Sequence, residues 1–151
     1  YAYNGTYHML HIIETLNDPL IEFIKDDPVR PEIPIDFRVS SNSEIFAIVE
    51  QDTPKAIVCV AYRHTVPTNC DELKDTTAPH TIAIFYTIWS YAPGAARLLI
   101  RKVRNALPER RPEITRFVTL SPKTEMARKF HLTNGATIFR ENETSINYEY
   151  N

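Results

Sequence analysis

Nine consecutive residues, Thr81 to Trp89, are apolar almost throughout, and this run most constrains the fold of the chain. A strand without polar alternation is typical of the centre of a sheet that is buried on both faces. The residues from Gly94 to Leu107 then show helical apolar spacing, and the residues from Ile114 to Leu120 form another apolar strand. A strand, a helix and a second strand in this order form a right-handed parallel crossover. The sequence therefore predicts one parallel strand pair with a helix over the sheet.

The remaining strands are expected to pair antiparallel. The runs Glu44–Glu50 and Lys55–Arg63 read as two strands joined by the turn Asp52-Thr53-Pro54. A second hairpin is predicted from Ala136 to Arg140 and from Ser145 to Tyr150. These pairs favour a mixed, mostly antiparallel sheet.

Three further helices are expected. Apolar residues at helical spacing predict one over Tyr7 to Asn17, and Asp18-Pro19 reads as the capped start of the next. A helix from about Lys123 to Thr133 is closed by Asn134-Gly135. Together the elements predict a single α/β domain over residues 1–151, with helices on both faces of the sheet. The polar stretch from His64 to His80 is a long loop of the kind that is functional or mobile.

The composition is that of an ordinary soluble protein. The net charge of −2 indicates no preference for nucleic acid or membrane, and no run of about 18 apolar residues predicts a membrane span. Cys59 lies in an apolar strand and Cys70 in a polar loop, which predicts reduced thiols and a cytoplasmic protein. Cysteine and histidine are not spaced as metal ligands, so no metal site is expected.

The segment Ala92-Pro93-Gly94-Ala95-Ala96-Arg97 opens the central helix and is a candidate anion site. Unpaired backbone N–H groups and the helix dipole favour an anion at a helix N-terminus. The small side chains let a diphosphate approach the backbone, and Arg97 adds a positive charge. The alternative is a tight strand–helix turn with a solvated basic face.

The order of the elements resembles the GNAT (N-acetyltransferase) superfamily. That superfamily holds the diphosphate of acyl-CoA with the pattern Arg/Gln-x-x-Gly-x-Gly/Ala. Gly94 and Ala96 match the last two fixed positions, whereas Tyr91 stands at the first. The resemblance implies that acyl-CoA contacts the end of the central strand and the start of the helix, at Ile88, Trp89, Tyr91, Gly94, Ala95, Ala96 and Arg97.

A closer resemblance covers about Ile82 to Arg140 and is to the catalytic domain of malonyl-CoA decarboxylase, itself GNAT-like. It is carried by the segments Ala83-Ile84-Phe85-Tyr86-Thr87-Ile88, Leu99-Ile100-Arg101-Lys102-Val103, Leu120-Ser121-Pro122 and Phe130-His131-Leu132-Thr133-Asn134-Gly135-Ala136. The resemblance implies that Ser121 and His131 are the catalytic pair. The family has a long insertion between these two segments, and this chain joins them almost directly.

Both residues also have a structural interpretation. Ser121 before Pro122 is a good helix N-cap, and His131 lies in a last helical turn, where the dipole favours a cation. Ten residues of straight helix rise about 15 Å. An unbroken helix from Pro122 would therefore separate the two side chains, whereas a helix that starts near Thr124 need not.

Three functions follow as hypotheses. The first is decarboxylation of a malonyl-type CoA thioester, with His131 as the acid and Ser121 as a donor to the carboxylate. The second is transfer of an acetyl group from acetyl-CoA to an amine, and the third is non-catalytic acyl-CoA binding. All three place the thioester between the strands Thr81–Trp89 and Ile114–Leu120. The Tyr-rich final hairpin is a candidate for pairing across a homodimer.

Overall fold

The computed structural model describes residues 9–151 of the chain. Its strands are β1 Met9–Ile13, β2 Ser43–Glu50, β3 Thr53–Arg63, β4 Ile82–Ser90, β5 Arg116–Thr119, β6 Ser121–Pro122, β7 Thr137–Glu141 and β8 Ser145–Tyr150. Its helices are η2 Pro19–Asp26, a 3₁₀ helix, and α1 Ile35–Arg38, α2 Cys70–Leu73, α3 Ala95–Arg110 and α4 Glu125–Thr133.

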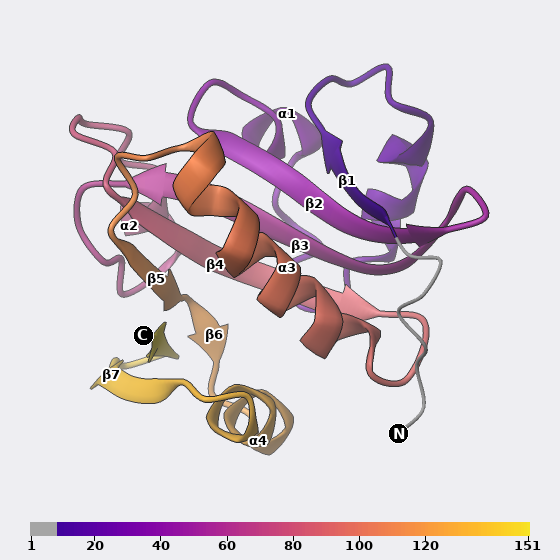
Figure 1. The fold of residues 1–151 in the computed structure, drawn as a ribbon. Coiled ribbons are helices and arrows are strands. Elements are labelled where there is room, and N and C mark those ends of the chain that lie inside the picture. Colours follow the sequence, from indigo (N-terminus) through magenta and orange to yellow (C-terminus); the bar gives the residue numbers. More distant parts are fainter. Residues whose placement is uncertain (1–8) are drawn as a thin grey trace.

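The strands form one mixed sheet in the order β1-β2-β3-β4-β5-β8-β6, with β7 paired to β8 (Figure 1). Strands β4 and β5 are parallel, and all other pairs are antiparallel. The predicted strand–helix–strand unit and both predicted hairpins are therefore confirmed. The α/β fold class is confirmed with them.

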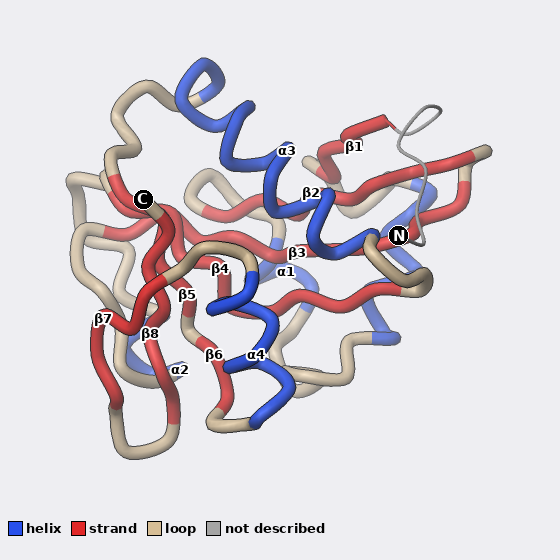
Figure 2. Tube along the Cα trace, turned by 60° about the horizontal axis from the view of Figure 1, so that its bottom comes forward, coloured by secondary structure: helices blue, strands red, loops and turns tan. Residues whose placement is uncertain are grey.

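Two clusters of buried apolar side chains cover the two faces of this sheet. Helix α3 packs on one face, where Leu99, Val103 and Leu107 contact apolar residues of β2 and β3. Helix η2, helix α1 and helix α2 lie over the other face (Figure 2), where Leu20, Ile24 and Leu73 are buried. The expectation of helices on both faces is correct.

The N-terminal helix prediction is wrong. Residues 1–8 lie outside the described part, and Met9–Ile13 form β1, which pairs with β2 from Val49 to Ile45. A run this short can be apolar at helical spacing and still extend, because pairing with an existing strand edge supplies its hydrogen bonds. The Asp18 cap is confirmed, since its Oδ1 accepts from Leu20 N at 2.8 Å.

Two boundaries also differ from the prediction. Helix α3 continues through Pro108 to Arg110 instead of ending at Leu107. The predicted strand Ile114–Leu120 is shorter, since β5 spans only Arg116–Thr119. Both β5 and the following β6 pair with β8, but only β5 pairs with β4. Gly94 and Gly135 adopt φ of 82° and 98°, which is the left-handed backbone that their rarity indicated.

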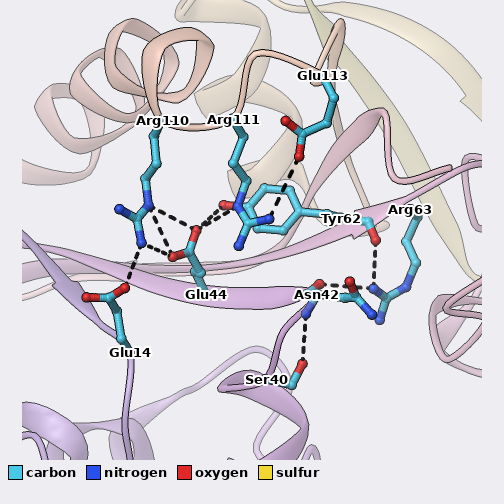
Figure 3. Close-up of polar contacts among 9 residues, drawn as sticks. All are labelled: Glu14, Ser40, Asn42, Glu44, Tyr62, Arg63, Arg110, Arg111 and Glu113. Atoms are coloured by element: carbon cyan, nitrogen blue, oxygen red, sulfur yellow. Dashed lines mark hydrogen bonds and ion pairs between the residues drawn. The ribbon is translucent and has the colours of Figure 1, made fainter. Parts of the chain in front are cut away.

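An ion-pair cluster fastens the end of α3 to the sheet (Figure 3). The buried carboxylate of Glu44 on β2 accepts from Arg110, from Arg111 Nε at 3.1 Å and from the hydroxyl of Tyr62 at 2.7 Å. The guanidinium of Arg111 also lies over the Tyr62 ring, 4.1 Å from its centroid. These contacts fix how α3 lies across β2 and β3, and thus where its N-terminus meets β4.

The loop from His64 to His80 is tied to the C-terminal hairpin. The amide of Asn147 on β8 donates to Pro67 O at 3.0 Å, and Ser145 Oγ donates to Thr68 O at 2.6 Å. Leu73, in the one helical turn of the loop, is fully buried. The loop therefore acts as a bridge between β3 and the last two strands.

Candidate active site

The parallel strands β4 and β5 separate halfway along β4. Their pairing runs from Ile82 opposite Arg116 to Phe85 opposite Thr119, and its last bond joins Leu120 N to Phe85 O at 2.9 Å. A β-bulge at the same height makes Tyr86 an extra residue on β4, because Cys59 of β3 faces Thr87 and Val60 faces Phe85. A bulge bends its strand and ends regular pairing. The second half of β4 is therefore left beside an opening.

A cavity of about 340 Å³ occupies this opening. Its walls come from the second half of β4, the β5–β6 connection, the start of α3, the first two turns of α4 and a short stretch before α1. The lining residues are Pro28, Val29, Phe85, Tyr86, Thr87, Ile88, Trp89, Ser90, Ala96, Leu120, Ser121, Pro122, Thr124, Met126, Ala127, Phe130 and His131. The lining is mainly apolar with a few polar groups, which is typical of a small-molecule site.

Ser121 is a wall residue of this cavity and not a helix cap. It lies in β6 opposite Ile146, and the cap of α4 is Thr124, whose Oγ1 accepts from Ala127 N at 3.2 Å. Of the two helix starts considered possible from sequence, the later one, near Thr124, is therefore correct. It allows Ser121 and His131 to line one cavity. The Ser121 side chain is buried, and its hydroxyl donates to Thr119 Oγ1 at 2.8 Å.

His131 is buried in the last turn of α4, with 3% of its surface exposed. Its ring stacks on Tyr148 at 5.0 Å, and its Nδ1 lies 2.8 Å from the hydroxyl of Tyr150. A buried phenol needs an acceptor, and among residues 9–151 His131 Nδ1 is the one within hydrogen-bond distance of the Tyr150 hydroxyl. The proton of a neutral imidazole is therefore assigned to Nε2. Nε2 is then the nitrogen available to a ligand in the cavity. The interpretation of His131 as a cation stabilised by the helix dipole is not supported, because burial lowers its pKa to about 4.

This low pKa predicts a pH dependence of stability. The unfolded chain takes up a proton on this histidine near pH 6.5, but the folded chain does so only near pH 4. The neutral imidazole therefore makes its full contribution to the free energy of unfolding above pH 6.5. This contribution, about 3 kcal/mol in all, is lost as the pH falls toward 4. Denaturant unfolding at about pH 7 and about pH 4.5 should show a larger loss for the parent than for His131→Gln. Equal losses would contradict a buried neutral imidazole.

The residues expected to contact acyl-CoA do not all line the cavity. Ile88, Trp89 and Ala96 line the cavity. Gly94 is the N-cap of α3 and forms no side-chain cap. The amide of Ala95 donates to Ala92 O at 3.2 Å, so the amides of Ala96 and Arg97 are the ones left for a ligand. Ala95 is buried beneath that turn. Tyr91 does not line the cavity, and its hydroxyl accepts from Trp89 Nε1 at 3.1 Å and donates to Asp26 at 2.8 Å.

Arg97 lines a second hollow, of about 310 Å³, between α3 and the end of α4. Arg101 and Arg104 come from the same side, and Asn134 faces them. Two buried atoms of this hollow, Arg104 Nε and Asn134 Oδ1, have no hydrogen-bond partner among residues 9–151. The hollow is therefore positively charged and rich in polar groups.

Several wall residues were missed by reasoning from sequence. Pro28 and Val29 belong to a proline-rich stretch that reads as a plain connector, and only the tertiary fold brings it to the cavity. Tyr150 is the next to last residue, and no motif marks it as the partner of His131. The one local signal was Asp27 before Pro28, since an aspartate there favours a side-chain–backbone turn.

In residues 9–151, no cluster of three or more potential metal ligands occurs. No helix within that range is long and apolar enough to cross a membrane.

Comparison with solved structures shows that the chain has the GNAT fold. It is similar to malonyl-CoA decarboxylase from Agrobacterium vitis, with a TM-score of 0.70 and 25% identity over 85% of this chain and 36% of that one. It is also similar to the GNAT domain of PAT from S. lividans, with a TM-score of 0.70 and 15% identity over 98% of both chains. A GNAT family acetyltransferase from Elizabethkingia anophelis, solved with acetyl-CoA bound, gives a TM-score of 0.64 and 9% identity over 96% of this chain and 98% of that one.

The suspected resemblance to the GNAT superfamily and to malonyl-CoA decarboxylase is thus confirmed at the level of structure. The chain spans about a third of the length of the decarboxylase from A. vitis. No protein-family model and no curated protein sequence is significantly similar to it.

Proposed function

We propose that this protein is an acyl-CoA-dependent enzyme that decarboxylates a malonyl-type CoA thioester. The observation that carries the proposal is that Ser121 and His131, the pair implied by the resemblance to malonyl-CoA decarboxylase, line one cavity beside the free half of β4. A decarboxylase needs one organic substrate, and one cavity with a hydroxyl and an imidazole supplies the groups that its chemistry requires.

The surroundings of the cavity suit a CoA thioester. The pantetheine arm would lie along the free edge of β4, where backbone groups near Ile88 can bond its amides and carbonyl oxygen. The diphosphate would then reach the first turn of α3, at Gly94 and Ala96, where the uncapped amides and the helix dipole favour an anion. Arg97 and Arg101 would add positive charge beside it.

Loss of CO₂ breaks a carbon–carbon bond and leaves its electron pair on the thioester as an enolate. Ser121 would donate its hydroxyl proton to the carboxylate instead of to Thr119. Thr119 would then donate its own hydroxyl proton to Ser121 Oγ, which reverses the hydrogen bond between the two residues. Thr119 Oγ1 accepts from Tyr148 N at 3.0 Å in both arrangements. The Nε2–H of His131 would then bind the enolate oxygen or protonate the carbon, which are roles of an oxyanion donor and a general acid.

Tyr150 completes this scheme as a proton source for His131. When Nε2 gives its proton to carbon, Nδ1 can take the proton of the Tyr150 hydroxyl, so that no imidazolate accumulates. The reaction consumes one proton, which solvent would return to the Tyr150 oxygen as the product leaves, because burial raises the pKa of this phenol. Reverse transfer along the same hydrogen bond would then restore the Nε2–H of His131. We therefore expect Tyr150→Phe to lower kcat about tenfold or more, in the range of one general-acid contact, with little change in the affinity for CoA. Nitrogen NMR of His131 should show a loss of the Nε2–H tautomer preference. A variant with unchanged kcat and tautomer would contradict this role.

The second candidate is N-acetyl transfer, which is favoured by the match over nearly the whole length of the S. lividans GNAT domain. There His131 would protonate the departing thiolate or help to deprotonate the amine. The third candidate is a module that binds acyl-CoA without reaction.

The deciding experiment incubates the protein with malonyl-CoA at neutral pH and follows CO₂ and acetyl-CoA together. Equal amounts of both products, lost in Ser121→Ala, are expected. Acetyl-CoA with a panel of amines serves as the parallel assay, in which release of free CoA thiol would instead favour the acetyltransferase. Tight binding of malonyl-CoA without turnover in either assay would reject the decarboxylase and leave the binding module.

A further inference from the structure

The guanidinium of Arg30 lies at the point where β4 and β5 separate. Its Nε donates to Tyr86 O at 2.9 Å, and its Nη2 donates to Leu120 O at 2.8 Å. These are carbonyls of the two diverging strands, just beyond the last ladder bond from Leu120 N to Phe85 O. Tyr86 is the bulged residue of β4, so its carbonyl is outside the regular pairing with β3. One side chain therefore joins the two strands where their own hydrogen bonds stop.

Arg30 is itself held from two sides. Its backbone N–H donates to Asp27 Oδ1 at 3.0 Å, and its carbonyl accepts from Arg38 Nη2 at 2.8 Å. Asp27 and Arg38 form an ion pair of 2.7 Å whose side chains are 0% and 1% exposed. Asp27 also accepts from Thr87 Oγ1 at 2.9 Å, on β4. The support of Arg30 is thus anchored in the strand that it bridges.

The same stretch closes the cavity. Pro28 and Val29 lie between Asp27 and Arg30 and line the cavity opposite α3 and α4, on the side of η2 and α1. If the bridge of Arg30 were lost, two carbonyls would lack a charged donor and this wall would lose its attachment. Hydrogen bonds to charged groups are the stronger ones in proteins, and unmade partners are costly.

From this geometry, and resting on the proposed use of a CoA thioester, we propose that Arg30 is a positioning residue of the acyl site. Its guanidinium sets the separation of β4 and β5 at the closed end of the cavity and holds Pro28 and Val29 against the acyl group. The diphosphate end of the ligand, which would lie toward Gly94, is not held by Arg30 or by the wall that Arg30 supports. Arg30 should therefore affect binding of the acyl group and turnover, but not binding of CoA itself.

The test compares Arg30→Met with Arg30→Lys and with the control Arg116→Met. Arg116 is a half-buried arginine at the other end of β5, paired with Glu149 at 2.8 Å and away from the cavity. Calorimetry with CoA, acetyl-CoA and malonyl-CoA gives the acyl preference, which is the affinity for each thioester divided by the affinity for CoA. Hydrogen exchange of the Leu120 amide, which bonds to Phe85 O, measures without any ligand how well β4 and β5 are held together. In Arg30→Met we expect the acyl preference to fall about 10-fold and Leu120 exchange to rise about 10-fold or more. The affinity for CoA should stay within about twofold.

Arg30→Lys should be intermediate, because one ammonium cannot hold both carbonyls in a fixed fork. Methylguanidinium should restore part of the acyl preference to Arg30→Ala, whereas Arg116→Met should match the parent in all of these measurements. If Arg30→Met does not fold, Arg30→Lys carries the same comparison.

The proposal is overturned if Leu120 exchange and the acyl preference are unchanged, or if affinity for CoA falls as much as affinity for the thioesters. Absence of CO₂ release by the parent would reject the decarboxylase alone, since the exchange and binding data do not depend on turnover.

Discussion

Replacement of His131 by alanine should abolish decarboxylation of malonyl-CoA while affinity for CoA stays nearly unchanged. The imidazole of His131 is the one histidine ring among residues 9–151 that lines the cavity between β4 and β6. Its contribution as a proton donor is expected to be about 10²–10⁴-fold in rate. CoA affinity should persist because the contacts proposed for the diphosphate and the pantetheine arm are with β4 and the start of α3, and not with His131. Steady-state kinetics and calorimetry on the same preparation separate the two effects.

His11→Ala is the matched control for this experiment. His11 lies in β1 and pairs with Asp18 at 2.7 Å, far along the sheet from β4. Its loss should leave the rate at the parent level. Because His131 packs against Phe130 and Tyr148, alanine leaves a cavity there, and His131→Gln tests the same chemistry with less loss of packing. A His131→Gln enzyme with the full rate would show that the site assignment is wrong.

The second large effect is expected on stability, from Arg38→Leu. Arg38 donates to the Asp27 carboxylate at 2.7 Å and to the carbonyls of Arg30 and Ile33 at 2.8 and 3.0 Å, and it is buried. Removal of one member of a buried pair leaves an uncompensated charge, which costs about 3–5 kcal/mol. Denaturant unfolding at neutral pH measures the loss. Such a loss is a large share of the total stability of about 5–15 kcal/mol that domains have.

Lys74→Met provides the comparison, since it removes an ion pair with Asp71 that lies in solvent. Exposed pairs contribute little to stability, so its unfolding midpoint should match that of the parent. If Arg38→Leu also unfolded at the parent's midpoint, the Asp27–Arg38 pair would not be the anchor of the stretch before α1. The support proposed for Arg30 would then need another source.

The parts of this fold that sequence reasoning predicted are those with a local signal. The apolar run that became β4, the helical spacing of α3 and the turn residues of both hairpins each report on their own segment. Gly94 and Gly135 likewise mark left-handed backbone because other residues avoid it. For β1 the local signal was misleading, since its pairing with β2 outweighed a weak helical pattern.

The candidate site divides in the same way. Ser121 and His131 could be selected from sequence by their resemblance to malonyl-CoA decarboxylase, but their chemical state could not. The hydrogen bond to Tyr150, the burial that keeps His131 neutral and the wall formed by Pro28 and Val29 all join residues far apart in the chain. The opening itself depends on the bulge at Tyr86 and on Ser121, which pairs with β8 and no longer with β4. Sequence alone determined most of the strands and helices, because backbone preference and apolar spacing are local. Tertiary structure alone decided where two strands part and which groups face the gap, because burial and hydrogen bonding depend on neighbours from distant segments.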